Sequence, residues 1–247
     1  MSHWLDGRVV ERIDWTDTLH SLRIEAPIEP FRAGQFIKIG LEIDGKVLGR
    51  PYSLVNPPDR QPLEVYFMTV PEGPLTPRLA ALKENDRILV APHANGFMVI
   101  DEVPHATTLW LIATGTGIAP FLSILSTEQA WDRFETIVLV HAVRNIREHT
   151  YRDQILAIAE HRTQRFHYIP FASRESADHV LAGRVPQAIT DGRLEARAGL
   201  SLDPAHSHVM LCGNPAMIDD TMAALTARGL KKHRRRDPGH ISVESYW

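Results

Sequence analysis

Two glycines mark the junction of an apolar run and an expected helix in LIATGTGIAP, residues 111–120. The run leads into Gly115-Thr116-Gly117, and Pro120 falls in the first helical turn. Glycine lets the backbone approach a ligand closely, and a helix N-terminus offers N–H groups and positive partial charge to a pyrophosphate. The spacing is GxGxxP rather than the GxGxxG dinucleotide fingerprint, and a tight strand–helix turn needs glycine even without a ligand. Alone, the segment indicates a nucleotide site only weakly.

A second strand end has the same design. In MLCGNPAM, residues 210–217, an apolar run is followed by Cys212-Gly213-Asn214 and then by a helix that starts at Pro215. Ligands of open α/β sheets bind outside the carboxyl ends of the strands, so the two glycine-bearing ends support each other. Cys212 also has a simpler interpretation, because a lone cysteine at a strand end is often a small buried hydrophobe.

Three arginines indicate which nucleotide is bound. Arg144 and Arg174 follow strand-like segments, and Arg184 opens a short helix. Guanidinium groups suit the 2′-phosphate of NADP, whereas an NAD site presents an acid to the ribose 2′-hydroxyl. Any one of these arginines is more simply a solvated surface residue. Three at related strand ends favour NADP.

The N-terminal part carries RPYSLVN, residues 50–56. Arg50 can bind a phosphate, Tyr52 can present its ring or hydroxyl to a flat ligand, and Ser53 offers a hydroxyl. Tyr66 lies in a later strand, and the turn Gly73–Thr76 prepares another helix N-terminus that can bind an anion. In the alternative interpretation, both tyrosines are core or rim aromatics.

The chain ends on VESYW, residues 243–247, after a strand-like stretch. A chain end has little reason to carry two large aromatic rings unless they cover something. Offset stacking on a flat ligand would order Tyr246 and Trp247; the alternative is that both rings pack into the core.

The elements that position these residues fall into two groups. Before Val103, short strands surround one helix, Pro77–Leu82, with Thr76 in the N-cap position, which indicates a small antiparallel barrel. The expected strands are Leu19–Ile24, Gln35–Leu41, Lys46–Leu54, Leu63–Met68 and Arg87–Leu89.

After Val103, strands alternate with helices, which indicates a doubly wound parallel sheet. The expected strands are Leu109–Ala113, Ile137–His141, Phe166–Phe171 and Val209–Leu211; the expected helices are Pro120–Thr127, Tyr151–His161, Pro186–Thr190 and Pro215–Ala227. The strands are nearly continuous apolar runs, as strands buried on both faces should be. We therefore predict a β-barrel domain of residues 1–103 and an α/β domain of residues 104–247.

Composition excludes several classes of protein. With 247 residues and a net charge of −3, the chain has no global field that favours nucleic acid or anionic lipid. Its single cysteine excludes an internal disulfide and a cysteine-ligated iron–sulfur cluster. No run has the length of a membrane span and no secretory h-region opens the chain, so a cytoplasmic enzyme is expected. The histidines are too scattered to indicate a metal.

These motifs together resemble one family. RPYS, the GPLT turn, GTGIAP, CGNPxM and the terminal Glu-x-Tyr-Trp follow the order and spacing seen in ferredoxin/flavodoxin–NADP⁺ reductases. The resemblance covers essentially the whole chain and is greatest to the short bacterial type, in which an aromatic residue follows the terminal tyrosine. It implies FAD on the barrel and NADP(H) on the α/β domain.

The resemblance also implies site residues by match of motif. For FAD these are Arg50, Pro51, Tyr52, Ser53, Tyr66, Gly73, Pro74, Leu75, Thr76, Thr116, Tyr246 and Trp247. For NADP(H) they are Gly115, Gly117, Arg144, Ser173, Arg174, Arg184, Gly213 and Asn214. Tyr246 would stack on the isoalloxazine ring, and Trp247 would cover the adenine of a folded FAD.

The implied reaction passes a hydride from NADPH to flavin N5 and then single electrons to ferredoxin or flavodoxin. Ser53 is expected near N5, Cys212 to orient the nicotinamide, and Glu244 to supply charge or protons unless it is only an exposed strand-end acid. Tyr246 would gate the nicotinamide site. Replacing it with serine should improve nicotinamide binding and weaken the preference for NADPH over NADH in steady-state kinetics.

The stretch LKKHRRR, residues 230–236, concerns partners. Its cations Lys231, Lys232, Arg234, Arg235 and Arg236 could steer acidic carriers, although a solvated helix end is an equal interpretation. We expect a monomer. The alternatives are an NADPH diaphorase or oxygenase reductase component and, from another class, a non-catalytic flavin redox sensor.

Overall fold

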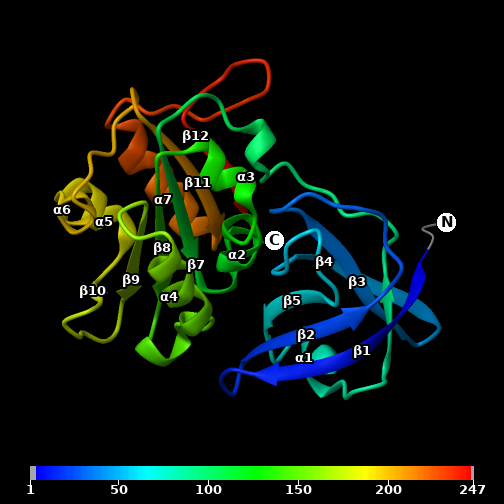
Figure 1. Ribbon diagram of the computed structural model, residues 1–247. Helices are drawn as coiled ribbons and strands as arrows, with labels where there is room; N and C mark the ends of the chain where they lie inside the picture. The colour runs from blue at the N-terminus through cyan, green and yellow to red at the C-terminus, as the bar shows by residue number, and fades with distance from the viewer. Residues whose placement is uncertain (1–3, 246–247) are drawn as a thin grey trace. The chain divides into compact units, whose positions relative to one another are not determined.

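The computed structural model describes residues 4–245, which form two compact units. The first contains the described residues through Val99 together with Ala119–Thr127, and the second contains Ile100–Ile118 together with the described residues from Glu128 onward (Figure 1). The predicted functional boundary between residues 103 and 104 stays a prediction.

The first unit is an antiparallel sheet with strand order β4-β3-β6-β1-β2-β5. Its strands are β1 (Leu5–Asp14), β2 (Leu19–Glu25), β3 (Phe36–Ile43), β4 (Lys46–Ser53), β5 (Leu63–Met68) and β6 (Arg87–Val90). A backbone bridge between Leu54 and Val65 joins the two edge strands. The sheet therefore curls on itself, and the predicted antiparallel barrel is confirmed.

Alternation along the strands builds the barrel core. Ile37 and Ile39 are fully buried, while Lys38 between them is exposed, because successive side chains of a strand point to opposite faces. Helix α1 (Thr76–Ala81) adds Leu79 to this core. Helix α2 (Ala119–Leu125) also belongs to the first unit, where Ser123 Oγ donates to the carbonyl oxygen of Asn56 over 2.8 Å.

Strand β1 was absent from the sequence-based prediction, although it lies between β6 and β2. Its sequence LDGRVVERID is largely polar, and Val9 is fully buried. The outward face carries charge instead: Arg8 pairs with Glu25 at 2.6 Å, and Arg12 with Asp14 at 2.9 Å. A barrel strand with one solvated face has too few apolar residues to be recognised by hydrophobicity.

The second unit is a wholly parallel sheet with strand order β10-β9-β8-β7-β11-β12. Its strands are β7 (Thr108–Thr114), β8 (Thr136–Val143), β9 (Phe166–Ala172), β10 (Leu181–Ala182), β11 (Ser207–Gly213) and β12 (Ile241–Ser245). Its α-helices are α3 (Glu128–Arg133), α4 (Arg152–His161), α5 (Val185–Thr190), α6 (Arg193–Ala198) and α7 (Pro215–Thr226). Short 3₁₀ turns cover η1 (Ile100–Glu102), η2 (Gly115–Ile118) and η3 (Ile146–Glu148).

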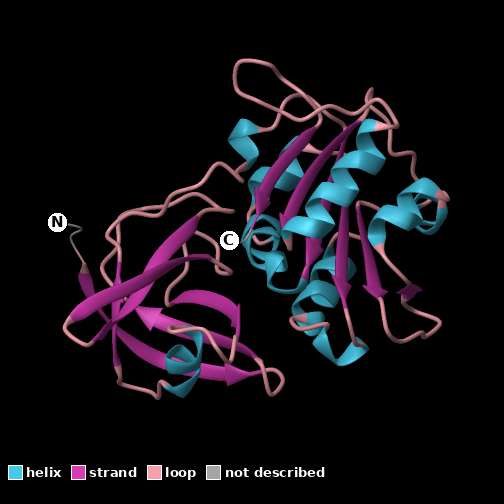
Figure 2. Cartoon of the chain, turned by 180° about the vertical axis from the view of Figure 1, so that it is seen from behind, coloured by secondary structure: helices cyan, strands magenta, loops and turns pink. Residues whose placement is uncertain are grey.

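Helices cover both faces of this sheet, as the two opposite views show (Figures 1 and 2). Trp110 and Ile112 of β7 pack with α5, α6 and α7 on one face. Leu109 and Leu111 point to the other face and are also fully buried. The predicted doubly wound parallel sheet is confirmed, and burial on both faces explains the continuous apolar runs.

The prediction omitted the short elements α3, α6 and β10. Helix α6 had a readable signal, because RLEARA is followed by Gly199, which ends the helix in the left-handed conformation. No helix in the described part of the chain has the length and apolar character needed to cross a membrane.

Candidate functional site

The second sheet reverses its direction of growth between β7 and β11. From β7 the chain adds β8, β9 and β10 on one side, then returns to add β11 and β12 on the other. In open α/β sheets such a switch point leaves a crevice at the carboxyl ends of the two strands, where ligands bind. Gly115–Gly117 follow β7, and Gly213 and Asn214 lie at the end of β11.

The two glycine-bearing strand ends pack directly on each other. A Cβ atom at Gly117 would lie 2.4 Å from the carbonyl oxygen of Cys212, and one at Gly213 would lie 2.2 Å from Thr114 Oγ1. Thr114 Oγ1 accepts a hydrogen bond from the backbone of Asn214 over 3.0 Å. Only glycine permits this approach, so the loops form one cradle of backbone groups.

Gly115 differs from these two glycines. Its φ is +51°, and a Cβ atom there would have no heavy atom of the described residues within 4 Å, apart from its neighbours in the chain. The left-handed backbone, rather than packing, favours glycine at this position.

Asn214 has a structural task of its own. It is the N-cap of α7, and its side chain accepts from the backbone N–H groups of Ala216 at 3.0 Å and Met217 at 3.4 Å. Pro215 occupies the first helical position, where its missing N–H costs nothing. The Asn-Pro pair therefore starts the helix that follows the cradle.

Cys212 and Glu244 are partners across β11 and β12. Cys212 is fully buried, and Glu244 is half-buried one residue before the end of the described chain. The register thus places a thiol and a carboxylate beside the switch point. Tyr246 and Trp247, assigned by resemblance to the flavin, lie outside the described residues.

The predicted 2′-phosphate residues share one edge of the same sheet. Strands β8, β9 and β10 end at Val143, Ala172 and Ala182, which are in register with one another. The residues that follow these strand ends are exposed: Arg144, Ser173, Arg174 and Arg184. The backbone N–H of Arg174 donates to the carbonyl oxygen of Arg144 over 2.9 Å, so two of the arginines come from adjoining chain segments.

The nearby carboxylates are engaged by backbone groups. Glu148 accepts from the N–H of Arg144 at 3.0 Å, and Glu175 accepts from the N–H of Ile146 at 2.6 Å. An edge with exposed guanidinium groups and occupied carboxylates is suited to a phosphate.

In the barrel, the RPYS motif forms the end of β4. Ser53 is buried, whereas Arg50 is exposed and donates to the carbonyl oxygen of Gly49 over 3.0 Å. The ring of Tyr52 meets Phe67 edge to face, with centroids 6.0 Å apart. Burial raises the pKa of the Tyr52 hydroxyl to about 12, so the phenol keeps its proton at neutral pH. Tyr66 is only 3% exposed, as its interpretation as a core aromatic predicts.

The prediction that Thr76 is an N-cap is wrong. Leu75 occupies that position, and Thr76 begins the helix. Thr76 Oγ1 instead accepts from the N–H of Val70 over 2.8 Å, while the N–H of Gly73 donates to the carbonyl oxygen of Val70. The hydroxyl therefore bonds the turn before α1 and does not cap the helix.

Comparison with known proteins identifies the family. Residues 111–223 match the oxidoreductase NAD-binding domain. Over the full length of both chains, the sequence is 48% identical to a flavodoxin/ferredoxin–NADP reductase of Escherichia coli K12. The chain belongs to the flavodoxin/ferredoxin–NADP reductases. The resemblance and the enzyme class inferred from the motifs are confirmed.

Other members of the family are also similar over nearly the whole chain. A ferredoxin–NADP reductase of Pseudomonas aeruginosa is 37% identical over 99% of this chain and 98% of its own. A ferredoxin NADP⁺ reductase from Neisseria gonorrhoeae, solved with bound FAD and NADP, superposes with a TM-score of 0.94 at 31% identity and covers 100% of both chains.

Two residues that contact this reductase's cradle were not predicted from the sequence. Thr114 bonds the backbone at Asn214, and its only signal was its place directly before Gly115. His141 lies fully buried in β8 and reaches the carbonyl oxygen of Gly115. The sequence shows it only as the end of an apolar strand, since its contact depends on the register of β7 and β8.

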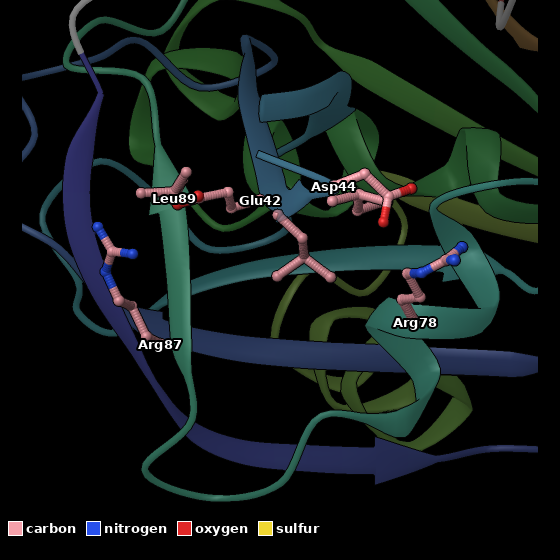
Figure 3. Close-up of a pocket in the computed structure, with 7 residues that line it drawn as sticks. Glu42, Asp44, Arg78, Arg87 and Leu89 are labelled. Atoms are coloured by element: carbon pink, nitrogen blue, oxygen red, sulfur yellow. The ribbon is translucent and has the colours of Figure 1, made fainter. Parts of the chain in front are cut away.

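A pocket of about 460 Å³ lies elsewhere on the reductase's barrel. Figure 3 shows Arg78 and Arg87 on opposite sides of it. The acids Glu42 and Asp44 also line it, and Arg87 pairs with Asp6 at 2.6 Å. Its lining carries both acidic and basic side chains, so it lacks the positive potential that binds a diphosphate. None of the predicted site residues lines it.

The basic stretch of residues 230–236 is not a helix end, contrary to one interpretation of the sequence, because α7 ends at Thr226. The stretch forms a loop before β12. Lys231 pairs with Asp237 at 2.8 Å, and Arg235 pairs with Glu102 at 2.7 Å. Lys232, Arg234 and Arg236 are also exposed. The described residues contain no group of three histidine, cysteine or acidic side chains placed to hold a metal ion.

Proposed function

We propose that this chain transfers electrons between NADP(H) and ferredoxin or flavodoxin through bound FAD. The observation that carries the proposal is the close packing of Gly117 against Cys212 at the switch point of the parallel sheet. A cradle that excludes even a Cβ atom is suited to a dinucleotide backbone. Full-length similarity to flavodoxin/ferredoxin–NADP reductases supports the same reaction.

The barrel residues suit FAD. Exposed Arg50 can pair with the diphosphate, the half-buried ring of Tyr52 can lie against the flat ring system, and Ser53 can donate a hydrogen bond. Pro51, Tyr66, the turn Gly73–Thr76 and Thr116 complete the proposed set. FAD, when bound, exchanges a hydride with the nicotinamide and single electrons with the carrier.

The second unit would hold NADP(H). Gly115–Gly117 would lie along the diphosphate, and Gly213 and Asn214 beside the nicotinamide. The 2′-phosphate would be held by Arg144, Ser173, Arg174 and Arg184. Their exposed positions at one sheet edge support preference for NADP(H) over NAD(H).

Cys212 and Glu244 are the proposed catalytic residues beside the nicotinamide. A buried thiol can fix the ring against one face, and a half-buried carboxylate can supply charge or exchange a proton. Ser53 and the terminal rings of Tyr246 and Trp247 are proposed to act at the flavin.

Ferredoxin and flavodoxin are the proposed partners, and the protein is proposed to act as a monomer. The docking surface would include the exposed basic loop of residues 230–236. Pairing with Asp237 and Glu102 reduces the charge at Lys231 and Arg235, so Lys232, Arg234 and Arg236 would contribute most to steering an acidic carrier.

The test is the visible absorption spectrum of the FAD-loaded protein during anaerobic addition of NADPH or NADH. Bleaching of the flavin by near-stoichiometric NADPH, and far less by NADH, is expected. Equal bleaching by both would contradict the arginine assignment, and failure to take up FAD would overturn the proposal. NADPH-dependent reduction of ferricyanide separates an enzyme from a non-catalytic sensor.

A further inference from the structure

His141 is a fully buried histidine that the proposed mechanism does not use. It is in register with Ala113 of β7, two residues before Gly115. Its Nε2 lies 3.1 Å from the carbonyl oxygen of Gly115. A carbonyl oxygen only accepts, so Nε2 carries the proton and donates it to this bond.

The other ring nitrogen, Nδ1, is also buried, and no described residue forms a hydrogen bond with it. Burial, with a contribution from nearby His149, lowers the pKa of His141 to about 3, so the ring is neutral at physiological pH. A buried polar atom without a partner is destabilising, and an apolar side chain would avoid that cost. The single hydrogen bond to Gly115 therefore calls for an explanation.

His149 holds the ring of His141 in place. The two rings pack edge to face with centroids 5.4 Å apart. His149 Nε2 lies 3.3 Å from the carbonyl oxygen of His141 and 3.2 Å from that of Phe171, so it ties β8 to β9. His149, which follows η3, thus packs on the ring of His141 and limits its freedom to leave Gly115.

The bond to Gly115 helps to hold the direction of one peptide group. Gly115 has φ +51° and opens the 3₁₀ turn η2, whose own hydrogen bonds involve this peptide, and the bond from His141 holds the same carbonyl oxygen from the side of β8. In a planar trans peptide the C=O of Gly115 and the N–H of Thr116 point in opposite directions. With the C=O turned toward buried His141, the N–H of Thr116 is turned away from the sheet interior.

We propose that His141 is a positioning residue for NADP(H): its hydrogen bond to the carbonyl oxygen of Gly115 anchors the first residue of η2 to β8 and so keeps the cradle in its nucleotide-binding form. The inference rests on the proposed function. His141 acts through the loop and need not touch the nucleotide. Losing the bond should weaken binding of NADP⁺ without affecting retention of FAD.

The experiment compares His141→Gln, whose amide can donate over a similar reach, with His141→Leu, which fills the space without a donor. Binding of NADP⁺ to each FAD-loaded protein is measured by calorimetry, and unfolding by thermal melting. We expect the Kd for NADP⁺ to rise about three- to tenfold in His141→Leu and to return toward wild type in His141→Gln. If His141→Leu does not fold, His141→Asn, whose amide is too short to reach Gly115, replaces it.

His208 supplies the matched control. It is 1% exposed in β11, burial lowers its pKa to about 3, and it lies at the opposite end of the sheet, in register with Leu109. His208→Leu should change the melting temperature and leave the Kd for NADP⁺ unchanged. Nitrogen-15 NMR of the wild-type protein should show His141 protonated at Nε2 only.

The remaining outcomes distinguish failure of the proposed function from failure of the inference about His141. Wild-type protein that retains FAD but does not bind NADP⁺ would overturn both the proposed function and this inference. Normal binding by wild type and equal binding by His141→Leu would overturn the inference alone, as would a fall in melting temperature with no change in Kd.

Discussion

The carbonyl oxygen of Cys212 lies where a side chain at Gly117 would begin, 2.4 Å from the position of a Cβ atom. This contact joins the ends of two strands that are almost 100 positions apart in the chain. It leaves no room for any residue but glycine, so the cradle is sensitive to a single methyl group.

Gly117→Ala should therefore impair the nucleotide site. We expect the free energy of unfolding to fall by about 1–3 kcal/mol, since neither backbone segment can yield cheaply. The KM for NADPH should rise at least about tenfold. Steady-state reduction of ferricyanide by NADPH and unfolding in urea would measure the two effects. Gly115→Ala is the matched control, because its Cβ atom would meet no described residue within 4 Å and the substitution is opposed by the left-handed φ; equal loss in both variants would contradict the steric argument.

The exposed arginines that follow β8, β9 and β10 predict a selective loss of affinity for NADPH. Arg174→Gln should raise the KM for NADPH about 10- to 100-fold and leave the KM for NADH unchanged, because a charge-assisted bond to the 2′-phosphate is lost. Arg147→Gln is the control, since Arg147 is also exposed in the 3₁₀ turn beside Arg144. A parallel rise for both nucleotides would show that Arg174 supports the loop rather than the phosphate.

Neutralising the basic loop should slow reduction of an acidic carrier. In the triple variant Lys232→Gln/Arg234→Gln/Arg236→Gln, the second-order rate constant with ferredoxin should fall several-fold at low ionic strength. The difference should shrink in salt, because exposed charges are screened over about 10 Å at 0.1 M. Bleaching of the flavin by NADPH should not change.

The control for net charge is the triple variant Arg8→Gln/Lys83→Gln/Arg87→Gln, which removes the same number of positive charges from exposed positions of the barrel unit. An equal loss of rate in that variant would assign the effect to the whole molecule and not to the loop.

Two buried histidines predict loss of stability in acid. Burial lowers the pKa of His141 and of His208 from 6.5 to about 3. Between these values the unfolded chain binds protons that the folded chain does not, so the free energy of unfolding decreases as pH falls below 6.5. Each histidine contributes at most about 1.4 kcal/mol per pH unit in that window.

Urea unfolding at pH 7.5, 6.0 and 5.0 would measure this slope. His208→Gln should reduce it, because one buried imidazole is gone. A wild-type slope of zero between pH 6.5 and 5 would mean that both rings accept protons while the protein stays folded.

The sequence by itself determined the two kinds of sheet and the segments that carry chemistry. Continuous apolar runs such as Leu109–Ala113 identify strands buried on both faces, and glycines directly after them mark strand ends. Asn214-Pro215 likewise predicts a helix start, since capping depends on neighbours in the chain. These are local effects, and each is readable in a short window of residues.

Only the tertiary structure decided which of those segments meet. Strand β1 is mostly polar, so its place between β6 and β2 follows from pairing partners far along the chain. The packing of Gly117 on Cys212 and the bond from His141 to Gly115 depend on strand order and on register between parallel strands. A shift of one residue would turn His141 to the opposite face, and no periodicity within β8 records that choice, because both faces of the strand are buried.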